Sequence, residues 1–128
     1  MVRFLSVLLL AAPTAVQAMP WLYVSSFTYS GSGYSCMREA ETALRRAGFT
    51  RDLERDPFDD PSTGGHVDGK LRYSDVAAAI ECDADIGTSA LAVSGLDNDL
   101  TYDKYSELRK HNSSNYSSVS KRLGITIK

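Results

Sequence analysis

Carboxylates are the most numerous side chains able to do chemistry, and they gather in two clusters. The clusters comprise Asp56, Asp59, Asp60 and Asp68 in one and Asp97 and Asp99 in the other. Hard cations such as calcium bind several such oxygens, and Asn98 could add a carbonyl oxygen. The spacing does not match an EF-hand loop, and aspartates beside Pro, Gly or Asn are typical of turns and helix caps. The pattern therefore favours turns and caps, with a metal site as the alternative.

Nucleophilic catalysis would need a base, and His66 and His111 are the only histidines. Both fall in segments that read as a loop or a tail, whereas a catalytic base needs neighbours that hold its geometry. No G-x-S-x-G motif is present, so pairing Ser35 or Ser94 with His66 has no support. We therefore predict no catalytic residue, no bound cofactor and no dedicated set of metal ligands.

One aromatic residue in the first acidic segment is difficult to explain as core. Phe58 lies between two prolines and next to Asp59 and Asp60. Exposed loop residues of this kind are typical of contact sites, although Phe58 could equally anchor the loop. We predict Phe58, Asp59, Asp60 and His66 as candidate contact residues.

The chain has two cysteines, Cys36 and Cys82. In an oxidising compartment an even pair is most simply one disulfide. The alternative, a redox or metal-binding thiol pair, is disfavoured because there is no C-x-x-C motif and no His beside either cysteine. We predict a structural disulfide that would stabilise the fold by about 4 kcal/mol.

The N-terminus has the three parts of a secretory signal peptide. Arg3 supplies positive charge, residues 4–12 form an apolar run, and Val16-Gln17-Ala18 ends in small residues. A membrane anchor is the alternative, but this run is shorter than the roughly 20 residues that span a bilayer. We predict cleavage near Ala18 and a secreted or periplasmic protein with no stable membrane insertion.

Composition excludes some classes of partner. Lys and Arg total 14 and Asp and Glu total 16, which gives a net charge of −2. Nucleic-acid binders usually carry a clustered basic surface, and the densest basic stretches here are only Arg45-Arg46 and Lys121-Arg122. We therefore expect no nucleic acid as a partner, and instead an unknown protein or a component of the cell envelope.

Periodicity predicts six main elements. They are strands over residues 21–29, 50–55, 73–82 and 88–94, and helices over 35–47 and 100–110. Ser35 is the expected N-cap of the first helix and Gly48 the residue just past its end. The aromatic residues of the first strand share one face, and we predict that this face packs against the core instead of forming an interface.

This order, β-α-β-β-β-α, predicts an α+β two-layer sandwich. We expect a small antiparallel or mixed sheet with two helices on one face, ferredoxin-like in element order. Residues 19–110 would form one domain, interrupted by a polar loop over residues 56–66. Residues 111–128 read as a flexible polar tail, which could end in a short strand over 123–127.

Three segments resemble small secreted bacterial proteins of unknown function. In these proteins a Cys opens an alanine-rich helix that ends in Ala-Gly-Phe, as residues 36–49 do here. A strand reading Ala-Ala-Ile-x-Cys matches residues 78–82, and a Val-x-Gly strand end matches residues 93–95. The resemblance covers residues 34–109 and implies a fold, export and a disulfide, without implying any chemistry.

Two classes of function therefore remain at this point. The first is an exported, non-enzymatic binding module that meets its partner through the sheet face or the 56–68 segment. The alternative is a metal- or small-ligand-binding protein, or a weak enzyme, that uses the 56–68 segment and the cluster at 97–99.

Overall fold

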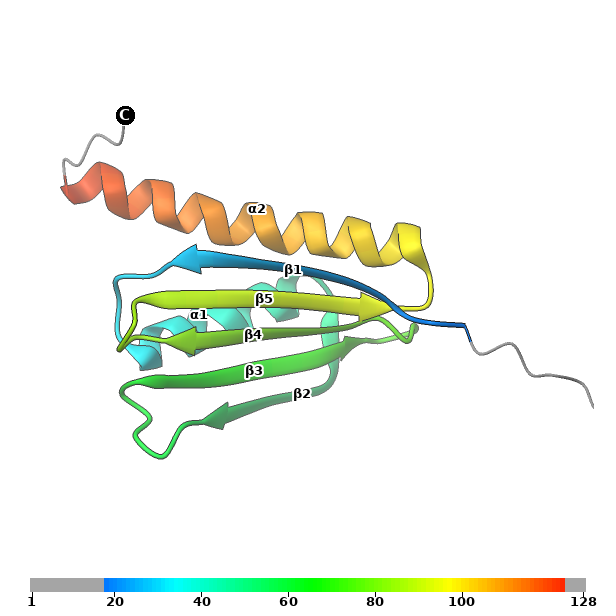
Figure 1. Cartoon of the computed structure of the whole chain (residues 1–128), viewed down its shortest axis with the longest axis horizontal. Coiled ribbons are helices and arrows are strands. Elements are labelled where there is room, and N and C mark those ends of the chain that lie inside the picture. The colour runs from blue at the N-terminus through cyan, green and yellow to red at the C-terminus, as the bar shows by residue number, and fades with distance from the viewer. Residues whose placement is uncertain (1–17, 124–128) are drawn as a thin grey trace, which may run out of the picture.

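The computed structural model describes residues 18–123, with side chains described up to residue 112. Its elements, in chain order, are β1 (Trp21–Thr28), α1 (Gly33–Arg46), β2 (Phe49–Pro57), β3 (Gly64–Leu71), β4 (Ala77–Asp83), β5 (Thr88–Gly95) and α2 (Asn98–Leu123). Figure 1 shows α1 behind the sheet and α2 running along β1. The predicted α+β two-layer class is confirmed.

The five strands form one sheet in the order β1-β5-β4-β3-β2, and every neighbouring pair is antiparallel. Strands β1 and β2 are therefore the two edges. Strand β4 lies at the centre, where its Ala78 and Ile80 are almost completely buried.

Both helices cover the same face of the sheet. Alternate residues of a strand point to opposite faces. Tyr23 and Phe27 of β1 pair with Val93 and Ser89 of β5, and Ser89 pairs with Cys82 of β4, so these side chains share one face. Cys82 is bonded to α1, and the ring of Tyr23 contacts α2. The other face of the sheet is turned toward the viewer in Figure 1, and no helix among the described residues covers it.

The core lies between this face and the helices. Its largest fully buried side chains are Phe49, Leu44, Ile80, Leu91, Leu108, Val67, Val76 and Val93. Small alanines at positions 40, 43 and 47 form the buried stripe of α1, and they allow the helix to approach the sheet closely. Phe27 and Tyr29 pack partly buried against this core, as the sequence predicted, whereas Trp21, predicted for the same face, is 51% exposed.

Helix α1 begins earlier than the sequence suggested. Its N-cap is Ser32, whose hydroxyl accepts a hydrogen bond from the Ser35 N–H, so the prediction of Ser35 as the cap is wrong. Gly48 follows the helix with φ +93°, the left-handed conformation that glycine adopts without strain. The predicted stop signal at Gly48 is therefore confirmed.

The predicted loop over residues 56–66 is wrong. Pro57 ends β2 and Gly64 begins β3, so a hairpin turn over residues 58–63 replaces the loop. The predicted order β-α-β-β-β-α therefore gains a strand, and the resemblance to ferredoxin-like order does not hold. Strand β3 could not be recognised from alternating apolar and polar residues. Glycines occupy three of its eight positions, and its outward side chains are polar.

The predicted strand over residues 73–82 is shorter and begins later. Residues 72–76 form a turn in which the Ser74 hydroxyl accepts a hydrogen bond from the Val76 N–H. Tyr73, the first residue of the predicted strand, is 91% exposed. Strand β4 then runs from Ala77 to Asp83.

The predicted polar tail is largely helical, because α2 continues to Leu123 instead of ending near Lys110. Serine and asparagine are only moderately unfavourable inside a helix, so composition alone was a poor guide here. The predicted strand over residues 123–127 starts at a helical residue, and residues 124–127 lie outside the described part of the chain. No helix among the described residues is long and apolar enough to cross a membrane.

Candidate functional site

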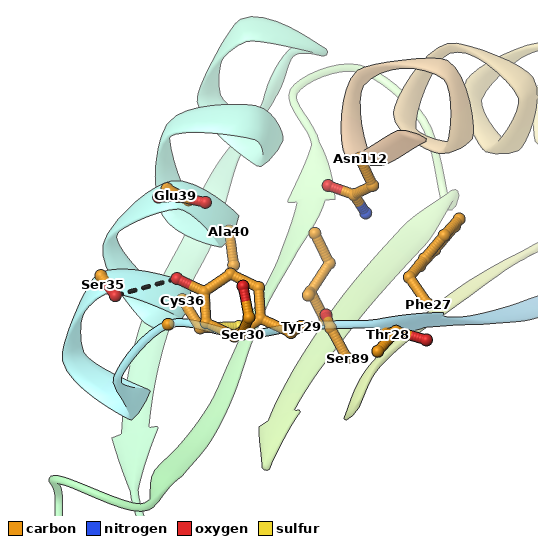
Figure 2. A pocket seen from close by; sticks show the side chains of 12 residues that line it. Phe27, Thr28, Tyr29, Ser30, Ser35, Cys36, Glu39, Ala40, Ser89 and Asn112 are labelled. Atoms are coloured by element: carbon orange, nitrogen blue, oxygen red, sulfur yellow. Dashed lines mark hydrogen bonds between the residues drawn. The ribbon is translucent and has the colours of Figure 1, made fainter. Parts of the chain in front are cut away.

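A hydrogen bond links the two helices near the end of α1, and a cavity lies between them near the start of α1. The Lys104 ammonium of α2 donates a hydrogen bond to the carbonyl of Ala47, just past the end of α1 (2.8 Å). Toward the start of α1, by contrast, Ser35 and Ala40 line a cavity together with Asn112 of α2 (Figure 2). The cavity therefore occupies the space between the helices, above the sheet.

The cavity has a volume of about 320 Å³ and is partly open to solvent. The sheet supplies Phe27, Ile80 and Ser89, while Cys36 and Ala40 line the α1 side. Known ligand pockets range from about 300 to 1,000 Å³ and are mostly apolar, with a few convergent polar groups. This cavity is at the small end of that range and has the same character.

Tyr29 and Ser35 form one polar group at the cavity. Their hydroxyl oxygens are 2.8 Å apart and share a hydrogen bond, which Figure 2 shows as a dashed line. Burial raises the pKa of Tyr29, and the hydrogen bond with Ser35 only partly opposes this effect. The phenol therefore stays neutral at neutral pH and can exchange its bond to Ser35 for one to a ligand.

Asn112 is the second polar group, and it comes from the opposite wall. Its Nδ2 atom is buried and has no hydrogen-bond partner among the described residues. Figure 2 shows the side chain extending from α2 into the space that also borders Glu39 and Ala40 of α1. A buried donor without a partner costs about 1–3 kcal/mol. An acceptor on a bound molecule would recover that energy.

The residues predicted as contacts lie elsewhere. Phe58 begins the β2–β3 turn, where its N–H donates to the Gly64 carbonyl and its side chain is 38% exposed. Asp60 holds the turn by accepting bonds from the Ser62 N–H and hydroxyl (2.9 and 2.7 Å). These two bonds lower the pKa of Asp60. Asp60 is therefore a turn-forming residue, as the capping and turn interpretation expected.

His66 lies on β3, on the sheet face without helices. Its Nε2 atom is 3.7 Å from a carboxylate oxygen of Asp56 and 3.7 Å from one of Asp68. None of Phe58, Asp59, Asp60 and His66 lines the cavity. Their role as contact residues stays a prediction.

The second acidic cluster forms the start of α2. Asp97 Oδ1 accepts a hydrogen bond from the Leu100 N–H (3.0 Å), and the Asn98 side chain accepts one from the Tyr23 hydroxyl (2.6 Å). Among the described residues, no group of three or more His, Cys, Asp or Glu side chains could hold a metal ion. The geometry therefore gives no support to the metal-binding alternative.

Sequence reasoning missed Asn112 because it placed this residue in a tail. The spacing did contain a signal, since Thr101, Leu108 and Asn112 are seven and four residues apart and so fall on one helical stripe. Thr101 and Leu108 are both buried. A polar side chain in line with the buried residues of a helix indicates either a buried hydrogen bond or a ligand-binding site.

Comparisons with known proteins do not identify a relative of this chain. No protein-family model, no curated protein and no solved structure matches the chain. The function must therefore be argued from the site itself.

Proposed function

We propose that this protein is an exported, non-enzymatic binding module, and that the cavity between α1 and α2 holds a small ligand. The observation that carries the proposal is the buried, unpartnered Nδ2 atom of Asn112 in a largely apolar cavity. Within the described residues no protein group uses this donor, so a ligand is the simplest acceptor for it.

Export is supported by two independent features. The first 18 residues have the charge, apolar run and small residues of a signal peptide. The disulfide between Cys36 and Cys82 is typical of proteins that fold outside the reducing cytosol. The resemblance to small secreted bacterial proteins agrees with both features, so we place the mature protein in the periplasm or the medium.

A binding role is favoured over catalysis by the groups at the cavity. The titratable side chains there are Tyr29 and Glu39. The raised pKa of Tyr29 keeps the phenol protonated at neutral pH, so it cannot accept a proton as a general base. Neither histidine lines the cavity, and no hydroxyl there has a basic partner to activate it.

The lining also restricts the class of ligand. An apolar body would lie against Phe27, Ile80 and Ala40, and one carbonyl or ether oxygen would accept the bond from Asn112. A second polar group would reach the paired hydroxyls of Tyr29 and Ser35. The Glu39 carboxylate at the cavity disfavours an anion, so we propose a small, largely apolar molecule that is neutral or cationic.

The test uses N-phenyl-1-naphthylamine, a neutral apolar dye whose fluorescence rises when it leaves water. We expect saturable binding to the wild-type protein and a loss of at least about tenfold in affinity for Ala40→Phe, which fills the cavity. Thr42→Phe places the same ring on the exposed side of α1 and is the matched control. Equal binding by Ala40→Phe and Thr42→Phe, or no binding by the wild type, would contradict the proposal.

Asn112→Leu gives a second measurement that does not depend on filling the cavity. It removes the unpartnered donor and keeps a side chain of similar size. We expect the variant to be at least as stable as the wild type, because a buried polar atom without a partner is lost. If Asn112→Leu instead lowers the stability of the ligand-free protein, the amide has a structural partner. That result would contradict the proposed ligand site.

A macromolecular partner, an envelope protein or another envelope component, is the second candidate function. The observation that favours it is Phe58, a large apolar side chain that is 38% exposed at the β2–β3 turn. A tagged protein should recover one partner at near equal stoichiometry, and Phe58→Ala should abolish the recovery. Recovery that Phe58→Ala and a shortened turn both leave unchanged would remove the turn from this hypothesis.

A further inference from the structure

Among the described residues, the outer edge of β1 presents backbone groups that do not bond to β5. The Tyr29 N–H donates to the Gly87 carbonyl at the start of β5 (2.8 Å), so the backbone of odd-numbered residues in this region faces β5. In an antiparallel strand the direction of these groups alternates from residue to residue. The N–H and C=O groups of Leu22, Val24, Ser26 and Thr28 therefore point away from the sheet. The Tyr105 hydroxyl agrees with this direction, because it reaches the outward Val24 carbonyl (3.3 Å).

The two edges of the sheet differ in how they resist further pairing. Strand β2 has a left-handed Asp52 (φ 51°), two register shifts, several charged side chains and a terminal Pro57. Natural sheets use such features to block edge-to-edge association. Strand β1 is an uninterrupted eight-residue strand with no charge and no proline. One edge is therefore blocked, and the other is open.

Exposed apolar side chains gather at the same place. Leu22 and Val24 of β1 are both 63% exposed, and Trp21 is about half exposed. Leu96 and Tyr102 are exposed nearby, since Trp21 pairs with Gly95 and the ring of Tyr102 contacts Tyr23. Leu22 and Val24 lie on the helix-free face and Trp21 on the helix-covered face, so exposed apolar side chains flank this edge on both faces, as is typical of an interface.

We propose that this edge pairs with β1 of a second copy of the chain. A two-fold axis perpendicular to the sheet would make the two β1 strands antiparallel and join the sheets into one of ten strands. The outward groups of Leu22, Val24 and Ser26 would then bond to the same groups of the second copy. Because β1 carries no charge, its pairing with itself meets no like-charge repulsion.

The position of α2 is compatible with this pairing. It contacts both β1 and β5 and runs along β1 in Figure 1, and its Tyr105 hydroxyl bonds to the outward Val24 carbonyl. Pairing with a second copy would exchange that single bond for a backbone one. Tyr102 and Arg109 lie three residues before and four residues after Tyr105 and so share its stripe of α2. Two α2 helices related by the two-fold axis would be antiparallel.

The blocked edge decides how many copies assemble. Continued head-to-tail addition would require β1 of one copy to pair with β2 of the next, and the irregular, charged β2 opposes this. Only the symmetric β1–β1 contact remains. The assembly therefore closes at two copies, as isologous contacts do.

The test is sedimentation velocity on the purified wild-type protein between about 1 µM and about 1 mM, where dimers of modest affinity dissociate. We expect a reversible dimer. Ser26→Pro removes an outward N–H that does not bond to β5, so the fold should tolerate it and the dimer should dissociate. Ser26→Ala keeps the N–H and is the matched control, which should stay dimeric.

Val24→Lys adds a side-chain test at an exposed position where folding is not at risk. Two lysines near the two-fold axis should weaken the dimer at least about tenfold. Ala90→Lys places the same charge on the same sheet face but on β5, one strand away from the edge, and should leave the dimer unchanged.

Hydrogen exchange locates the contact. Dimerisation should protect the amides of Leu22, Val24 and Ser26 in a concentration-dependent way, and the amides that already bond to β5 should show no such dependence. A wild-type protein that is monomeric throughout the range would overturn the proposal. A dimer that survives both Ser26→Pro and Val24→Lys would also overturn it, because the contact would then lie elsewhere.

Discussion

Lys104 of α2 donates a hydrogen bond to the Ala47 carbonyl, which lies at the end of α1, over a distance of 2.8 Å. The Lys104 side chain is three-quarters buried, and it also pairs with Glu107 one turn further along α2. A cation at a helix C-terminus interacts favourably with the helix dipole and with the last carbonyls, which have no partner inside the helix. This bond joins α2 to the end of α1, away from the cavity.

We predict that Lys104→Met lowers the free energy of unfolding by about 1–2 kcal/mol, because a partly buried hydrogen bond to a charged group is lost. Urea unfolding followed by circular dichroism measures the change. Lys70→Met is the control, since Lys70 makes an exposed ion pair with Asp52 and its loss should change stability by less than about 0.5 kcal/mol. Equal effects of the two substitutions would show that the bond to Ala47 contributes nothing specific.

Two glycines with positive φ should respond differently to alanine. Gly64 has φ +136°, and a Cβ there would lie 1.9 Å from the Cys82 carbonyl oxygen on the neighbouring strand. Gly48 has φ +93°, but its nearest neighbour would be a Leu71 methyl group at 3.5 Å. Gly48→Ala should therefore cost only the backbone penalty, about 1–2 kcal/mol. Gly64→Ala must move backbone and should cost more than about 4 kcal/mol.

Thermal unfolding of both variants checks this order. Gly64→Ala should show little soluble folded protein or a strongly lowered melting temperature, whereas Gly48→Ala should fold. A Gly64→Ala protein as stable as Gly48→Ala would mean that β3 and β4 do not approach each other as closely as described.

The strong helix and the buried strands could be predicted from the sequence because their patterns are local. The alanine stripe of α1, its stop at Gly48 and the alternation of β5 all depend on residues within a few positions of one another. Strand β3 could not be found in this way. Its glycines are required by close contacts with Asp56 and Cys82, residues that are distant in the sequence.

The candidate site was missed for a related reason. The cavity is lined by residues of β1, α1, β4, β5 and α2, which are far apart in the sequence, so no local pattern encodes it. Asn112 belongs to the site only because α2 continues past Lys110. Conversely, the acidic residues attracted attention by their number, and Asp60 and Asp97 proved to hold a turn and a helix start.

Cysteine pairing was predictable from the sequence, and its energetic role can be measured. Cys36 and Cys82 form a disulfide with a Cα–Cα distance of 6.0 Å, which joins the first turns of α1 to β4. Replacing both with alanine should lower the free energy of unfolding by about 2–5 kcal/mol, the range typical of native disulfides in small domains. The double substitution avoids a free thiol that could form other products.

Mass spectrometry of the natively folded protein, with and without a thiol-blocking reagent, tests the disulfide directly. An unmodified mass shows that both cysteines are oxidised. Two modified thiols in the native protein would contradict the disulfide, whatever the stability of the double variant.

Glu41 connects α1 to the blocked edge of the sheet, and its effect should depend on pH. Its carboxylate accepts a hydrogen bond from Arg45 on the same helix and pairs with Arg55 on β2. The bond from Arg45, followed by the bond and charge of Arg55, lowers the pKa of Glu41 below its ordinary value of 4.5. A carboxyl with a lowered pKa in the fold stabilises the protein above the unfolded-state value. That stabilisation is lost as the pH falls through the lower folded-state value.

We therefore predict that Glu41→Gln destabilises the protein by about 0.5–1 kcal/mol near neutral pH, the magnitude typical of a partly exposed ion pair. The difference from the wild type should shrink as the pH falls below 4.5. Combining Glu41→Gln with Arg55→Gln in a double-mutant cycle separates the link to β2 from the bond to Arg45. The coupling energy, measured by urea unfolding at several pH values, should vanish in acid. A coupling that is constant across this range would show that the Glu41 charge does not carry the contact between α1 and β2.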